Sequence, residues 1–96
     1  MTEQDKALAV QLVKQRLNRL PEDTSLDDYL TARVGAAAEE LEDLGIRLVM
    51  GKLSDILMVV DLAVWEYQCR DKETGMPDWL RLRRRERYLR ERRGQA

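Results

Sequence analysis

The segment from Leu53 to Tyr67 constrains the fold of this chain most, because it is apolar around almost its whole circumference. Eleven of its fifteen residues are apolar. A surface helix carries a single apolar stripe, so a helix of this composition has to be covered on several sides. Monomers seldom expose contiguous apolar patches of more than a few hundred Å². We therefore expect cover from the chain's own helices and from a second subunit together.

Two N-terminal segments also have helical spacing of their apolar residues. Residues 2–19 form the first predicted helix, with Thr2 as the N-terminal cap and Pro21 as the stop signal. Residues 26–44 form the second, with a heptad-like apolar stripe. Gly45 follows that stripe and fits the left-handed C-terminal cap.

The remaining helix boundaries rest on turn and proline signals. Ser25 or Thr24 is expected to cap the second helix. Residues 46–50 fit either an extended segment or one helical turn. The apolar helix is predicted from about residue 54 to about residue 70, and Pro77 is expected as the first residue of a fourth helix.

These elements predict an all-α fold, a small bundle of three to four helices with an arginine-rich C-terminal helix or arm. Ninety-six residues supply one modest hydrophobic core. Residues 1–77 are expected as the helical bundle domain, with a net charge of −6, and residues 78–96 as the arm, with a net charge of +5. The arm is therefore expected to bind an anionic partner.

The composition argues against an enzyme. The chain has no histidine, which is the commonest general base and metal ligand. Its one cysteine, Cys69, cannot build a thiolate zinc site and fits a reducing compartment, and no glycine-rich loop resembles a phosphate cradle. No metal, cofactor or catalytic residue is predicted. The longest uncharged apolar run, residues 56–60, is far too short to cross a bilayer, and residues 1–5 lack a secretory signal.

Two sets of carboxylates are candidate chemical sites. The cluster on the second helix is better interpreted as a solvated acidic face than as a cation site or an acid-base pair. It consists of Glu39, Glu40, Glu42 and Asp43. Asp61 interrupts the apolar helix, and an edge position or a hydrogen bond to a helix end in the same assembly is favoured there over catalysis, because buried charges are usually paired.

A further pattern runs through the second half of the chain. It consists of Asp55, Leu57, Ala63, Trp65, Tyr67 and Arg70, then Met76, Pro77 and Leu80. Shorter matches lie before it, at residues 13–17, 27–30 and 37–41. Together they resemble the head-tail connector proteins of tailed bacteriophages and prophages, which are also called head-completion or adaptor proteins. The arginine-rich extension after Leu82 departs from that pattern.

The resemblance implies a helical bundle and a structural role in virion assembly. Connector proteins of this kind form rings of about a dozen subunits below the portal, where they extend the DNA channel and complete the head after DNA packaging. The implied partners are further copies of the chain, the portal protein, a stopper or tail-completion protein and the genomic DNA in the channel, with no membrane. The implied location is the virion, and the host bacterial cytoplasm during assembly.

Two surfaces follow as hypotheses. The subunit interface is expected on the apolar helix, with the small residues 35–38 also aiding close packing between helices, because a ring subunit needs two unlike lateral surfaces. Its residues are Ile56, Val59, Val60, Val64, Trp65 and Tyr67. The contact with the portal or another polyanion is expected on the arm, since arginine grips carboxylates and phosphates with two bonds. Its residues are Arg81, Arg83, Arg84, Arg85, Arg87 and Arg90.

Two other interpretations of the arm remain open. It could belong to a small nucleic-acid-binding regulator that contacts phosphates directly, with an affinity that falls steeply as salt rises. It could also be a solvated helix, stabilised by Glu86–Arg90 and Arg87–Glu91 pairs at four-residue spacing.

Overall fold

The computed structural model describes residues 1–20, 22–69 and 75–95, and within these ranges every regular element is a helix. The helices are α1 (Glu3–Arg16), α2 (Asp27–Asp43), α3 (Leu53–Gln68) and α4 (Asp78–Gln95). The prediction of an all-α bundle is therefore confirmed. Within these ranges, no helix combines the length and the apolar character needed to span a bilayer.

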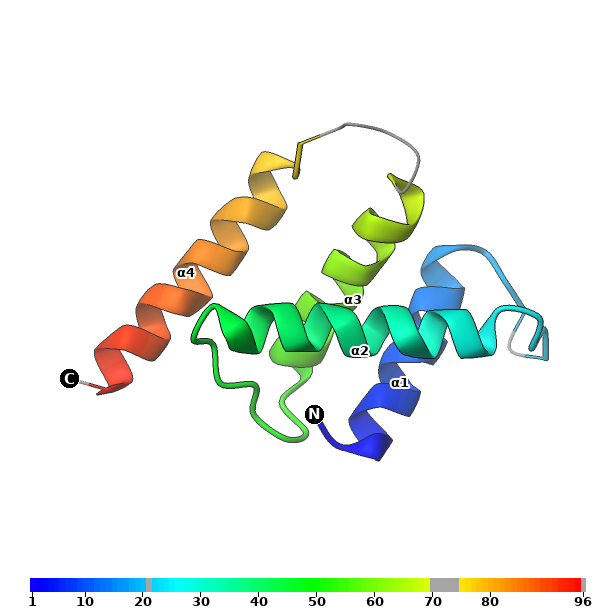
Figure 1. Cartoon of the computed structure of the whole chain (residues 1–96), viewed down its shortest axis with the longest axis horizontal. Coiled ribbons are helices and arrows are strands. Elements are labelled where there is room, and N and C mark those ends of the chain that lie inside the picture. Colours follow the sequence, from blue (N-terminus) through cyan, green and yellow to red (C-terminus); the bar gives the residue numbers. More distant parts are fainter. Residues whose placement is uncertain (21, 70–74, 96) are drawn as a thin grey trace.

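The helices form a flat, elongated bundle with extents of 45 × 32 × 18 Å. Helices α1, α2 and α3 pack on one another, with α2 lying across the other two, and α4 packs against α3 (Figure 1). The centre of this arrangement is a core to which all four helices contribute. Its fully buried members include Ala9, Val13, Leu30, Val34, Leu41, Val59, Leu62 and Leu80.

Two of the caps predicted for α1 and α2 are present, at Thr2 and at Gly45. The Asp5 amide donates to the Thr2 hydroxyl at 3.1 Å. Gly45 ends α2 with a φ of +94°, and the Ile46 amide donates to the Leu41 carbonyl at 3.1 Å. That bond satisfies a carbonyl that the helix end would otherwise leave free, and the side chains of Leu41 and Ile46 are both buried beside it.

The end of α1 differs from the prediction, since the helix stops at Arg16 and not near residue 19. Asn18 takes a left-handed conformation with a φ of +60°. The Arg19 amide then donates to the Lys14 carbonyl at 2.9 Å, which is the pattern of a glycine-type cap formed by asparagine. The stop therefore comes from Asn18, before the proline acts.

Three further boundaries are settled by the structure. No side chain caps α2, so the expectation for Ser25 or Thr24 is wrong, and the Ser25 amide and hydroxyl instead donate to Asp23. Residues 46–50 form neither helix nor strand. Pro77 lies just before α4, where its carbonyl accepts from the Arg81 amide at 3.0 Å. The predicted end of the third helix at Arg70 lies outside the described residues.

Most of the apolar surface of α3 is covered within the chain, while Leu53 and Leu57 are 57% and 38% exposed. Ile56, Val59, Val60 and Val64 are buried, while Trp65 and Tyr67 are half-buried against the core. The cover comes from α1, α2 and α4, which all pack on this helix. The four buried residues belong to the core of one copy, so their assignment to a free lateral surface of a ring subunit is wrong.

The small residues of α2 do not all serve packing inside the chain. Ala37 and Ala38 are buried, as the hypothesis of close approach requires. Gly35 and Ala36 face away from the core, and a Cβ added at Gly35 would meet no atom within 4 Å. The outward part of this run leaves room beside α2 that the described chain does not use.

Candidate functional site

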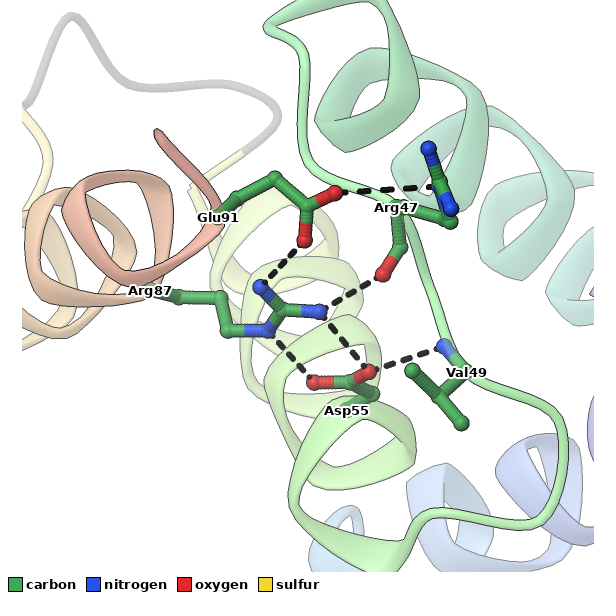
Figure 2. Close-up of polar contacts among 5 residues, drawn as sticks. All are labelled: Arg47, Val49, Asp55, Arg87 and Glu91. Carbon is green, nitrogen blue, oxygen red and sulfur yellow. Dashed lines mark hydrogen bonds and ion pairs between the residues drawn. The ribbon is translucent and has the colours of Figure 1, made fainter. Parts of the chain in front are cut away.

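The inner face of α4 is held to α3 by a buried ion pair between Arg87 and Asp55 (Figure 2). Nε of Arg87 donates to Oδ1 of Asp55 at 2.9 Å, and Nη2 donates to Oδ2 at 3.3 Å. Arg87 is only 5% exposed and Asp55 is 2% exposed. Two charges this far from water are tolerated because each is paired and hydrogen-bonded.

The same pair also fixes the loop between α2 and α3 (Figure 2). Arg87 donates through Nη2 to the Arg47 carbonyl at 2.6 Å and through Nη1 to Glu91 at 3.0 Å. The Val49 amide donates to Oδ2 of Asp55 at 2.9 Å. One arginine therefore ties α4, the loop and the start of α3 together, and the predicted Arg87–Glu91 pair is confirmed as part of this network.

The network sets the ionisation of its carboxylate. Burial, the largest single influence, raises the pKa of Asp55, but the hydrogen bonds from Arg87 and the Val49 amide and the charges of Arg87 and Lys52 outweigh it. The net effect is a pKa of Asp55 below its usual value. The hydrogen bond to Asp55 is the main cause that raises the pKa of Arg87.

A second carboxylate joins three helices. Asp61 of α3 accepts from Arg16 of α1 at 2.5 Å and from Arg83 of α4. Its side chain is nearly buried, whereas both guanidinium groups are about half-exposed. Asp61 is therefore paired with two arginine side chains, where the sequence suggested an edge position or a hydrogen bond to a helix end. Asp55 and Asp61 hold α4 against α3 by pairing with Arg87 and Arg83. Leu80 is the apolar residue of α4 that is buried in the core.

A third polar cluster lies between α2 and α3. Arg33 donates to Glu66 at 2.8 Å, Glu40 lies beside Glu66, and Arg84 approaches Glu40 at 4.0 Å. Burial is the first cause that raises the pKa of Glu40, and the neighbouring Glu66 adds to it. Two carboxyl groups this close favour keeping one proton, because both charges together repel.

We expect Glu40→Gln to stabilise the fold slightly at neutral pH. A carboxyl group whose pKa is raised in the folded state favours folding below its unfolded pKa, and that contribution is lost as pH rises through the folded value. The amide removes the repulsion but can still bond to Glu66. Since the Glu40 side chain is about half-exposed, we expect a gain below about 1 kcal/mol. Urea denaturation at pH 7 and pH 4 should show the gain at pH 7 alone, and an equal gain at both would contradict this origin.

The arginines expected to contact a portal or polyanion divide into three groups. Arg87 is buried, so its assignment to an external contact is wrong. Arg83 is bound to Asp61, and Arg81 pairs with Asp78 in the first turn of α4. Arg84 is half-buried near Glu40. Arg85 and Arg90 are exposed and form no ion pair within the described chain, and the expected Glu86–Arg90 pair is not formed.

The outer face of α4 carries three exposed apolar side chains. Trp79, Leu82 and Leu89 are 49%, 56% and 46% exposed. Their spacing of three and seven places them on one side of the helix, roughly opposite Leu80 and Arg87. The guanidinium of Arg83 lies over the Trp79 ring at 5.4 Å. The spacing was visible in the sequence, but which side faces α3 was not.

The outer face of α2 is acidic, as the sequence indicates. Glu39, Glu40, Glu42 and Asp43 are all exposed. Glu42 lies 3.6 Å from the N-terminal amine and Glu40 lies near Arg84. Among the described residues, no group of three or more possible ligands is arranged to hold a metal ion. The acidic face therefore offers charge toward solvent.

The structure thus presents two outward helix faces of opposite charge and an inner set of arginine-carboxylate pairs that position one of them. Comparisons with models of known protein families, with curated proteins and with solved structures find no match to this chain.

Proposed function

We propose that this chain is a non-enzymatic assembly protein, a head-tail connector subunit of a tailed bacteriophage or prophage. In this proposal copies of the chain form a ring beneath the portal and complete the head after DNA packaging. The ring then provides a seat for a stopper or tail-completion protein, with the genomic DNA passing through its channel. The assembled protein belongs to the virion, after assembly in the bacterial cytoplasm.

The observation that carries the proposal is the outer face of α4. Trp79, Leu82 and Leu89 lie about half-exposed on one helix face, with Glu86 between the two leucines and the unpaired charges of Arg85 and Arg90 beside them. Apolar side chains that line one helix face and are rimmed by charge are typical of protein-protein contacts. The buried Arg87–Asp55 pair fixes that helix, so the face is presented in a defined position.

A nucleic-acid-binding regulator is less well supported by the structure than an assembly protein. Phosphate binding needs several free cations, and the arm has fewer than its composition suggests. Arg81, Arg83, Arg84 and Arg87 are engaged with carboxylates of the same chain, at distances up to 4.0 Å. Phosphates also provide no apolar surface for Leu82 and Leu89. The duplex DNA affinity is therefore expected to be weak at physiological salt.

The test combines assembly with partner binding. Sedimentation across concentration and electron microscopy should show growth from single copies to closed rings with a central channel. The gene is expected to lie beside portal, capsid and tail genes, and the portal protein encoded there should bind the purified chain. The proposal would be overturned if the protein remained monomeric at high concentration and did not bind that portal protein. Deletion of residues 83–96 is unsuitable as a control, because it removes Arg87 from the core.

A further inference from the structure

We propose that the outer face of α4 in one copy packs across the outer face of α2 in the next copy, so that subunits join head to tail. This inference rests on the self-assembly in the proposed function and adds the two surfaces that meet. It is carried by the complementary size and charge of these faces.

The donor surface is the outer face of α4. Leu82 and Leu89 lie two turns apart at its centre, with exposed Glu86 between them and Trp79 at one edge. Basic side chains flank this centre. Arg85, Arg90 and Arg93 are all exposed, and none forms an ion pair among the described residues.

The acceptor surface is the outer face of α2. Its centre is small, since Ala32 and Ala36 are exposed there and Gly35 has open space beside it. Carboxylates flank this centre. Asp28, Glu39 and Asp43 are exposed, and none forms an ion pair within the described residues.

The two faces are complementary in shape. Large side chains on one helix pack well into a shallow surface made by small residues on another, because the backbones can then approach closely. Leu82 and Leu89 are separated by roughly 10 Å along α4, and Asp28 and Asp43 by roughly 22 Å along α2, at 1.5 Å per residue. The acceptor is therefore long enough to receive the donor ridge with its flanking arginines.

The two faces are also complementary in charge. Three unpaired arginines would meet three unpaired carboxylates, and arginine can bind each carboxylate with two parallel bonds. Because the faces lie on different helices of one subunit, the contact is heterologous. Such contacts repeat from copy to copy and close into a ring when the rotation allows it. This supplies the two unlike lateral surfaces that α3 cannot provide.

The experiment uses two full-length variants with opposite defects. Arg85→Glu with Arg90→Glu removes the donor and leaves the acceptor, and Glu39→Lys with Asp43→Lys removes the acceptor and leaves the donor. Each variant alone is expected to remain a single copy under conditions where the wild type assembles. A mixture should assemble with the two variants in alternation, because the unaltered donor of one variant meets the unaltered acceptor of the other, and the glutamates of the altered donor meet the lysines of the altered acceptor. All four substitutions in one chain should restore assembly, since the charges are then exchanged.

The control changes the net charge equally at sites away from both faces. Gln4→Glu, Gln11→Glu, Gln15→Glu and Gln68→Glu alter exposed positions, and this quadruple variant should assemble like the wild type. Circular dichroism on each variant verifies that the helices remain. Raising the salt concentration should weaken wild-type assembly, because the pairs are at the surface.

Each outcome discriminates between the two proposals. If the wild type forms rings that bind the portal and the donor variant does so equally well, these surfaces are wrong while the connector function stands. If the donor variant still assembles but loses affinity for a duplex DNA probe, the arginine face serves nucleic acid instead. If the mixture stays as single copies, like each variant alone, the contact is not α4 on α2. A wild type that never self-associates overturns both proposals.

Discussion

Replacing Val59 with Asp should leave the purified chain largely unfolded. Val59 is fully buried near the centre of α3, within the apolar core, where a new carboxylate would be removed from water. Burying an unpaired charge costs several kcal/mol, which is comparable to the roughly 5–10 kcal/mol that stabilise a domain of this size. Far-ultraviolet circular dichroism and a thermal melt at neutral pH would show the loss of helix and of a cooperative transition.

Leu57→Asp is the matched control for this result. Leu57 lies in the same helix, but 38% of it is exposed, so a carboxylate there can reach water. We expect this variant to fold, with a loss below about 2 kcal/mol. Similar tolerance at both positions would mean that α3 is not covered by its own chain, and the assignment of its residues to the core would fail.

Replacing Arg87 with Met should lower the free energy of unfolding by about 3–5 kcal/mol. The substitution removes the partner of a buried carboxylate and leaves Asp55 with the Val49 amide alone. Methionine keeps much of the side-chain volume, so the loss reports on the charge more than on a cavity. Urea denaturation of dilute protein, followed by circular dichroism, measures the change.

Two further variants serve as controls for the unfolding measurement on Arg87→Met. Arg90→Met alters an exposed arginine of the same helix and should change the unfolding free energy by less than about 0.5 kcal/mol. Asp55→Asn combined with Arg87→Met removes the stranded charge while the amide oxygen can still accept from Val49. The double variant should therefore regain part of the loss. If Arg87→Met and Arg90→Met lowered the free energy of unfolding equally, the Arg87–Asp55 pair would not be what holds α4 on α3.

The same pair predicts how stability varies in acid. Because the pKa of Asp55 is lowered in the folded state, its contribution is present above the unfolded pKa of about 4 and is lost as pH falls through the folded value. Wild-type stability should therefore decrease below about pH 4. In Arg87→Met this decrease should be smaller, since the carboxylate no longer gains from its partner.

These expectations give the arginines of α4 two separate tasks. Arg83 and Arg87 face α3 and hold the helix to the bundle through Asp61 and Asp55. Arg85 and Arg90 face outward, where they are available to a partner. The inner pairs matter for assembly because a helix fixed in place loses less conformational entropy when its outer face binds.

The sequence determined the local structure to within a few residues, because helical periodicity, Thr2 and Gly45 act through neighbours along the chain. The sequence also showed that a charge at Asp61 is costly inside an apolar helix, but its arginine partners appear only in the structure. The stop at Asn18 follows from local structure too, because asparagine tolerates the left-handed conformation, although Pro21 is the stronger stop signal in the sequence.

Only the tertiary structure decided which side of each helix faces inward. Leu80 and Leu82 are the same residue type two positions apart, and Arg85 and Arg87 likewise, yet one of each pair is buried and the other is exposed. Periodicity places residues on a common face but does not say which face meets α3. That choice depends on how four helices share a small core, and the carboxylates of α3 fix it by pairing with Arg83 and Arg87.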